Sequence, residues 1–139
     1  MRISTKGRYG LRAIIDIAKN NSGNALPLRE IAKIEGVSEK YLEHILKKLN
    51  SAGLVRSIRG SRGGYVLNMP CKEITAGMVL RALEGSISPT SCVAEGECEK
   101  GVECAAAYVW HKLKDAIDGV VDNITLDEIC ENTEKEQEK

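Results

Sequence analysis

A single glycine, Gly36, separates two short segments whose apolar residues recur at helical spacing. Pro27 suits the first turn of a helix over 28–35, and glycine commonly ends such a helix. Ser38 then caps a second helix, which Gly53 closes. The apolar positions of the second helix follow i, i+3, i+4 and i+7 spacing and are Leu42, Ile45, Leu46 and Leu49. Two short helices joined by a tight turn predict a helix-turn-helix.

A β-hairpin is predicted directly after these helices. Residues 54–58 and 65–67 are β-type runs, and the segment Arg59-Gly60-Ser61-Arg62-Gly63-Gly64 lies between them. Glycines allow the tip its turn conformations, and arginines on such a tip can enter a minor groove or hold phosphate. A hairpin in this position is the wing of a winged helix, which argues against an ordinary helical hairpin.

The second helix carries polar side chains suited to DNA contacts. Basic groups can hold phosphates, and a few other side chains can reach base edges. The candidates on or near this polar side are Ser38, Lys40, Tyr41, Glu43, His44, Lys47 and Lys48.

Charge divides the chain into two halves, although the formal net charge is zero. Residues 1–70 hold 13 Lys and Arg against 5 Asp and Glu, whereas residues 71–139 hold 7 against 15. The basic half therefore favours a polyanion partner, with an uneven solvated surface as the plain alternative. We expect a DNA-binding region over 1–70 and a second region over 71–139.

Further helices are predicted on both sides of the winged helix. Ser4 or Thr5 caps a first helix that runs to about residue 20, and Thr75 caps one over 76–84. A long helix over 105–122 has an apolar stripe that a small domain cannot bury alone, which favours pairing with a second copy of the chain. Thr125 begins a last short helix, and we expect 131–139 to be frayed. The fold class is mainly α with a small β-hairpin wing.

Three of the five cysteines fall within 13 residues: Cys92, Cys98 and Cys104. They lie in a loop over 86–104, which is long enough to indicate a functional segment. No apolar run is long enough to span a membrane, and no signal peptide is evident, so we expect a cytoplasmic protein with reduced thiols. Soft-metal binding and redox sensing are then the leading roles. Zinc fits the five-residue gaps poorly, and a thiol–disulfide switch stays open. Cys71 and Cys130 are expected to be small buried side chains.

The sequence motifs together resemble the IscR/CymR family of bacterial transcriptional regulators. The segments that carry this resemblance are MRISTKGRYG at the start, VSEKYLE in the second helix of the pair, SIRGSRGGY at the wing and ITAGMVLRALEG in the helix over 76–84. The resemblance implies a dimeric winged helix with a long dimerisation helix. IscR-type members carry three cysteines at this spacing, bind a [2Fe–2S] cluster with them and regulate iron–sulfur assembly genes, often as repressors.

The same resemblance implies roles for individual residues. Cys92, Cys98 and Cys104 are the implied cluster ligands. Tyr41, Glu43, Arg59 and Gly60 match DNA-reading positions, and Ser4, Lys6 and Tyr9 match positions that contact the DNA backbone. Ser38, Lys40 and Arg62 complete the candidate DNA-binding set from the residues themselves. The implied partners are double-stranded operator DNA and a second copy of the chain.

One position departs from the IscR pattern. A histidine is expected three residues after the third cysteine, and Ala107 stands there instead. His111, one turn further along, is the candidate fourth ligand, with a solvent-facing side chain as its alternative. The loop acids Glu95, Glu97, Glu99 and Glu103, and a group from a partner chain, are further candidates. We expect a labile cluster that is readily lost.

Two other functions compete with this interpretation of the sequence. A CymR-like regulator of cysteine and sulfur metabolism, with a thiol-reactive or vestigial triad, is the closest alternative. A redox enzyme or metal carrier is disfavoured, because no Cys-x-x-Cys pair, nucleotide loop or acid–base constellation is present. We therefore expect a regulator and not an enzyme.

Overall fold

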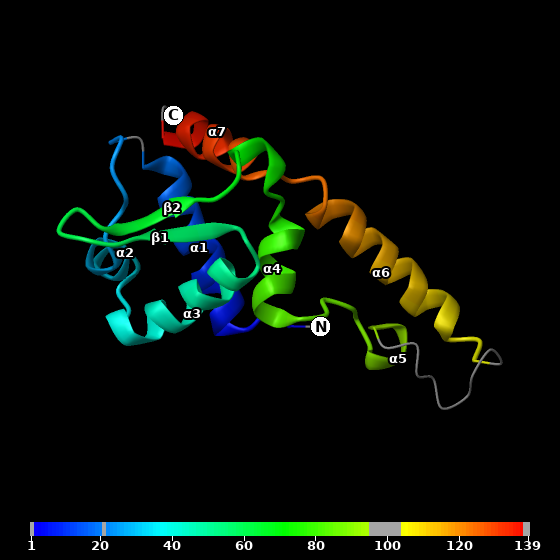
Figure 1. The fold of residues 1–139 in the computed structure, drawn as a ribbon. Helices are drawn as coiled ribbons and strands as arrows, with labels where there is room; N and C mark the ends of the chain where they lie inside the picture. The colour runs from blue at the N-terminus through cyan, green and yellow to red at the C-terminus, as the bar shows by residue number, and fades with distance from the viewer. Residues whose placement is uncertain (1, 21, 95–103, 138–139) are drawn as a thin grey trace.

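The computed structural model describes residues 2–20, 22–94 and 104–137, and it is mainly helical with one β-hairpin (Figure 1). Along the chain the elements are α1 (Thr5–Lys19), α2 (Leu28–Glu35), α3 (Glu39–Ser51), β1 (Val55–Ile58), β2 (Gly64–Leu67), the 3-10 helix η1 (Cys71–Glu73), α4 (Ala76–Glu84), α5 (Ser91–Ala94), α6 (Ala107–Val121) and α7 (Leu126–Gln137). This order confirms the predicted winged helix.

Side-chain caps and glycines set the helix ends where the sequence predicts them. Ser4, Ser38 and Thr75 each accept a hydrogen bond from a backbone N–H in the first turn of their helix. Gly36 ends α2 in the left-handed conformation with φ 68°. The predicted bounds of α1 to α4 therefore agree with the structure to within about two residues.

The wing is a two-stranded antiparallel hairpin with one additional contact. Val55 pairs with Leu67, and Ile58 pairs with Gly64. Leu26, from the segment before α2, bridges to Tyr65 through two backbone hydrogen bonds of 2.9 and 3.0 Å. A Cβ atom on Gly64 would lie 2.3 Å from the carbonyl oxygen of Leu26, so this position needs glycine. The bridge between Leu26 and Tyr65 therefore joins the start of β2, close to the wing tip, to the segment before α2.

The core takes residues from both halves of the chain. Helix α1 packs against α2, α3, α4 and α7, which places it at the centre of the body (Figure 1). The largest fully buried side chains are those of Ile14, Ile31, Leu42, Ile45, Leu46, Leu49, Leu54, Ile74 and Leu126. The charge division of the sequence therefore does not coincide with a division of the packing.

Helix α7 corrects the expectation that residues 131–139 are frayed, because the helix continues to Gln137. Thr125 begins it as predicted, accepting a hydrogen bond from Glu128 N. Leu126 is fully buried, and Ile129 packs against the same core. Tertiary contacts on its first turns thus stabilise a helix whose charged sequence predicts little order.

Helix α6 extends from the body as an arm, with α5 beside its outer end (Figure 1). It begins at Ala107, two residues later than predicted, and none of its residues is fully buried. The short helix α5 corrects the expectation that 86–104 lacks regular structure, at least over 91–94. Among the described residues, no helix is both long and apolar enough to cross a membrane.

Candidate nucleic-acid interface and cysteine segment

The polar side of α3 is exposed as the sequence predicts. Lys40, Glu43, His44 and Lys47 are all exposed, whereas the opposite side of the helix is fully buried. Glu43 and Lys47 form an ion pair one turn apart, at 3.8 Å. Ser38, a predicted DNA contact, also caps the helix, because its Oγ accepts a hydrogen bond from Tyr41 N. The arrangement leaves a row of long polar side chains free to meet a duplex groove.

Tyr9 of α1 and Tyr41 of α3, both predicted DNA contacts, lie against each other. Their rings meet edge to face with centroids 6.2 Å apart. The guanidinium of Arg12 lies over the Tyr9 ring at 5.4 Å from its centroid. The aromatic pair and the Arg12 guanidinium therefore join α1 to the start of α3, which is the recognition helix of the helix-turn-helix.

Arg12 also contacts a buried acidic pair that sequence reasoning missed. Its Nε donates a hydrogen bond of 2.7 Å to Oε1 of Glu35, whose side chain is 4% exposed. Asp16 lies beside Glu35, and burial, followed by the charge and hydrogen bonding of Glu35, raises the pKa of Asp16 to about 7. Two acidic residues on different helices carry no signal of pairing in the sequence.

The wing tip presents the predicted arginines. Arg59, Gly60 and Arg62 are exposed, and Gly60 has φ 108°, a conformation that favours glycine. In β2, next to the tip, burial and then the charge of Glu43 raise the pKa of Tyr65. The wing and the recognition helix therefore lie close enough for their charges to interact.

Of the predicted DNA-backbone contacts near the N-terminus, Ser4 is bound to α4. Glu84 Oε1 accepts a hydrogen bond of 2.9 Å from Ser4 N and a second one from Ser4 Oγ. Lys6 lies in the first turn of α1, close to Lys48 of α3. Ser4 is thus held by α4 and by its own capping bond, and its main role in the structure is to fix the start of α1.

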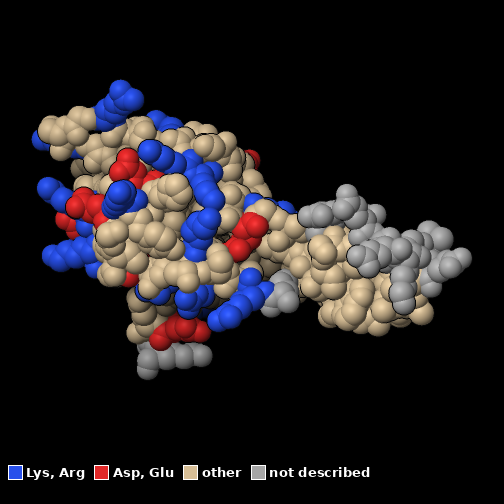
Figure 2. All heavy atoms as spheres, turned by 90° about the horizontal axis from the view of Figure 1, so that it is seen from below, with Lys and Arg blue, Asp and Glu red and all other residues tan. Residues whose placement is uncertain are grey.

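Lys and Arg side chains are spread over the face of the body that carries α3. Figure 2 shows this face from below Figure 1, with few acidic side chains among the basic ones. The arm formed by α6 is by contrast largely uncharged in this view. The basic half of the sequence therefore forms one positively charged face, as a polyanion partner requires.

The cysteine triad is described only in part. Cys92 lies in α5, and Cys104 lies three residues before α6 begins; both are half-buried. Cys98 falls outside the described residues. Because α5 packs against α6, the two described thiols come from segments in contact. Thr90 Oγ1 lies 3.0 Å from Cys92 Sγ. Among the described residues, no three potential ligands meet in one place.

The two candidate fourth-ligand positions differ in their distance along the chain from Cys104. Ala107 is the first residue of α6, and its N–H donates a hydrogen bond of 3.1 Å to Cys104 O. His111 lies one turn further along α6 and is exposed. Position 107, where the IscR pattern has histidine, is therefore one turn from Cys104. The imidazole that this chain does have, that of His111, lies one turn further from Cys104. The acids Glu95, Glu97, Glu99 and Glu103 lie outside the described residues.

Cys71 and Cys130 lie away from Cys92 and Cys104, on η1 and α7, which contact each other. Burial is the main cause that raises the pKa of both thiols. A raised pKa keeps a thiol protonated and unreactive. Both are half-buried, which is less than the sequence interpretation supposed, but their chemistry is that of packing residues.

Comparisons with known proteins point to one family. A family model described as Rrf2, iron-dependent transcriptional regulator, matches residues 3–132. The regulator IscR of Photobacterium profundum is 40% identical over 129 residues, covering 93% of this chain and 75% of the relative. IscR of Escherichia coli is 38% identical over 134 residues, covering 96% of this chain and 83% of the relative.

Solved structures agree with these matches. CymR of B. subtilis, described as its global cysteine regulator, superposes with a TM-score of 0.81 at 40% identity, covering 95% of this chain and 98% of CymR. IscR of T. potens gives a TM-score of 0.79 at 36% identity, covering 99% of this chain and 91% of IscR. Both fold comparisons extend over the wing, the long helix and the C-terminal helix.

Proposed function

Because this chain belongs to the Rrf2 family of transcriptional regulators, we propose that it binds operator DNA as a homodimer and represses iron–sulfur cluster assembly genes. The observation that supports this most strongly is the pairing of a basic recognition face with a cysteine segment on the arm. The proposed input is a [2Fe–2S] cluster held by Cys92, Cys98 and Cys104. Its proposed output is a change in DNA affinity.

The DNA-reading part of the proposal uses α3 and the wing. In this proposal Lys40, Tyr41 and Glu43 meet base edges in a major groove, and Arg59 and Arg62 on the wing reach phosphate or a minor groove. Tyr9, packed on Tyr41, steadies the start of α3. A homodimer would present two such units to a two-fold-symmetric operator.

The cluster part of the proposal uses the donors at the outer end of α6. Thiolates are the preferred ligands of iron–sulfur clusters. Cys92 lies in α5 and Cys104 lies just before α6, and these two helices pack against each other. A bound [2Fe–2S] cluster supplies a redox-active and oxidant-sensitive group. Holding it would tie the segment between α5 and α6 to the start of α6. Since α6 leads directly to α7 and the body, that constraint can bias the orientation of the arm.

Ala107 makes a weakly held cluster the expected state. One helical turn joins position 107 to Cys104, so a histidine there would be a local fourth ligand, whereas alanine has no donor. We propose His111 or solvent as the fourth ligand of the wild-type chain. Either leaves the cluster easier to lose than a set of four local ligands.

Anaerobic reconstitution with iron and sulfide tests the proposal on four chains: wild type, Cys98→Ser, His111→Ala and Ala107→His. Visible absorption, with iron and acid-labile sulfide assays, measures cluster content, and decay of the absorption in air measures its retention. We expect the wild type to bind a cluster, Cys98→Ser to lose it, and Ala107→His to retain it about tenfold longer, in line with the effect of improving a ligand set.

Operator binding is read on the same samples by fluorescence anisotropy, with and without cluster. Wild-type protein that takes up no iron and sulfide, or that holds zinc against exchange, would refute the cluster proposal. Equal decay of wild type and Ala107→His would refute the local fourth-ligand argument. Equal cluster retention in His111→Ala would assign the fourth position to solvent or to another group.

A CymR-like function is the second candidate. The high similarity to B. subtilis CymR and the alanine at position 107 favour it. In that case the triad would be vestigial or would respond through its thiols, and DNA binding would be independent of iron. Loss of operator binding on treatment with a thiol oxidant, without any bound iron, would support this reading over the cluster.

A further inference from the structure

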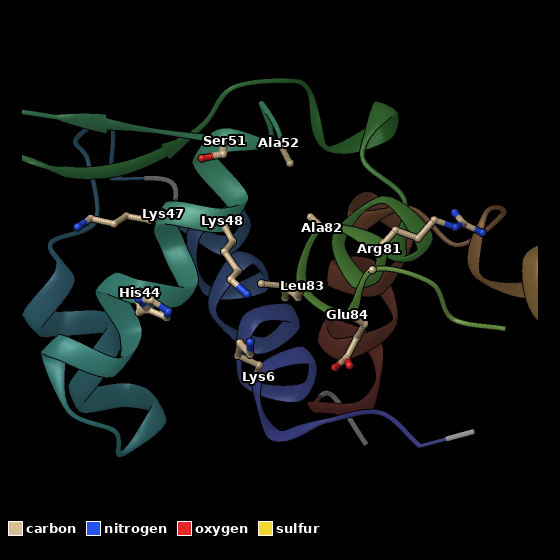
Figure 3. A pocket seen from close by; sticks show the side chains of 11 residues that line it. Lys6, His44, Lys47, Lys48, Ser51, Ala52, Arg81, Ala82, Leu83 and Glu84 are labelled. Atoms are coloured by element: carbon tan, nitrogen blue, oxygen red, sulfur yellow. The ribbon is translucent and has the colours of Figure 1, made fainter. Parts of the chain in front are cut away.

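A solvent-open hollow of about 690 Å³ lies between α3 and the end of α4 (Figure 3). The C-terminal half of α3 forms one wall, the last turn of α4 forms the other, and Lys6 of α1 lies at its base. The side chains of Lys6, His44, Lys47, Lys48, Arg81 and Glu84 contribute to its lining. Five of these six side chains are basic, so the hollow is suited to an anion.

Two lysines converge inside this hollow. Figure 3 shows the side chain of Lys48 directed from α3 toward that of Lys6, whereas Lys47 and Arg81 point away to opposite sides. The neighbouring Lys6 side chain is the main cause that lowers the pKa of Lys48, as expected for two like charges that face each other. Neither lysine forms an ion pair with a carboxylate in the described part of the chain.

The other charged groups of the hollow already have partners. Arg81 is bound to Asp118 of α6 and to Asp122 just after it, and Lys47 pairs with Glu43 on the surface of α3. Glu84 accepts hydrogen bonds from Ser4, and its charge acts on Lys48 only as a lesser influence. The uncompensated charge of the hollow is therefore concentrated at Lys6 and Lys48.

We propose that Lys6 and Lys48 together form a clamp for one phosphate group of the DNA backbone. A phosphodiester carries a single negative charge and two unesterified oxygens, so each ammonium group can donate to it and their mutual repulsion is relieved. The clamp lies along the same helix that presents Lys40 and Glu43, and contacts to phosphate beside a base-reading helix fix its position on the duplex. The inference rests on the proposed DNA-binding function and adds Lys48 to it.

Salt dependence of DNA binding tests this clamp. Wild type, Lys6→Met, Lys48→Met and the double variant are compared with Lys19→Met, which removes an exposed lysine at the opposite end of α1. The probes are a 30-base-pair duplex selected by the wild-type chain from a random pool and an unselected duplex of equal length. Anisotropy measured from 50 to 200 mM KCl gives the slope of log K against log salt.

We expect the double variant to reduce that slope by about 1 for each bound subunit, because one phosphate contact per subunit is lost. Affinity should fall for both duplexes alike, since a phosphate contact carries no sequence information. The losses of DNA affinity in the two single variants should not add up to the loss in the double variant, because both amines bind one phosphate. Lys19→Met should keep the wild-type slope, and thermal melts should show that all variants fold.

Two outcomes overturn the clamp but leave the proposed function intact, provided that the wild type still binds its selected duplex. In the first, the double variant keeps the wild-type salt slope. In the second, Lys19→Met reduces the salt slope as much as the double variant does. A third outcome that overturns the clamp comes from titrating the DNA-free protein with inorganic phosphate and following the lysine amino groups by NMR. Saturable phosphate binding there, with an unchanged DNA slope, would assign the hollow to a free anion instead. Failure of wild type to select any duplex would instead overturn the proposed function itself.

Discussion

Asp16 and Glu35 illustrate how single residues acquire properties from packing. One Asp16 oxygen, Oδ2, is buried and has no hydrogen-bond partner among the described residues. A proton on Asp16 allows that carboxyl to donate to its neighbour, and Arg12 balances the remaining charge of Glu35. The pair therefore keeps a proton at a pH where most carboxyl groups are ionised.

This raised pKa predicts that stability falls as the pH rises. In the unfolded chain Asp16 titrates near pH 4, whereas in the folded chain it titrates at about 7. Between these values the folded state binds the extra proton, so the free energy of unfolding declines as pH increases and levels off above 7. Asp16→Asn should remove this slope and be more stable than wild type at pH 8 by about 1 kcal/mol, because partial exposure screens part of the penalty.

Urea unfolding at several pH values between 5 and 8.5 measures this effect. Asp115→Asn is the matched control, since Asp115 is exposed on α6 and should leave the pH dependence unchanged. Parallel curves for wild type and Asp16→Asn across this range would show that Asp16 is ionised throughout.

Among the described helices of eight residues or more, α6 is the one with no buried residue. Arg81 of α4 supplies ion pairs that join it to the body. That guanidinium bonds Asp118 at 2.7 Å and also Asp122, so it ties the last turn of α6 to α4. Lys114 completes the network by pairing with Asp118 within α6 itself.

Removing Arg81 should therefore loosen α6 more than removing Lys114. Arg81→Met is expected to weaken the docking by about 1 kcal/mol, because bidentate pairs in a network exceed single surface pairs. Amide hydrogen exchange in the last turns of α6 should become roughly fivefold faster. Lys114→Met, which breaks only a contact within the helix, should change exchange by less than twofold. Equal effects of the two variants would contradict the assigned role of Arg81.

The short elements were predictable because their ends depend on neighbouring residues. Ser38 caps α3 and Gly36 ends α2 through bonds and dihedrals within a few positions, so a local pattern is enough. Helix α7 was predicted too short because its stability comes from Leu126, which is buried by α1 and η1. Such contacts join distant parts of the chain, so a pattern within a short segment does not predict them.

At the scale of the whole molecule, four of the five large apolar side chains that are exposed among the described residues lie on α6. Val109, Leu113 and Val120 are between 44% and 58% exposed and recur at near-heptad spacing. Leu113 and Val120 also line an apolar hollow of about 430 Å³ with Ile87 and Leu80. The proposed homodimer would bury this surface.

Light scattering after gel filtration tests that dimer. Leu113→Glu should convert it to a monomer, because the substitution places a charge in the apolar stripe. Asp115→Lys, a charge change about 200° around the same helix, should leave the dimer intact. A wild-type chain that is monomeric at micromolar concentration, or a dimeric Leu113→Glu variant, would contradict pairing through this stripe.

The winged helix, the polar side of the recognition helix and the family resemblance can all be predicted from the sequence alone. Each depends on periodicity, caps and motifs that are contained in short segments. Three other features become visible only in the folded chain: Lys6 faces Lys48, Asp16 shares a buried site with Glu35, and α7 is ordered to Gln137. These features arise where helices far apart in the chain come together, and burial and proximity then set the charge states of their side chains.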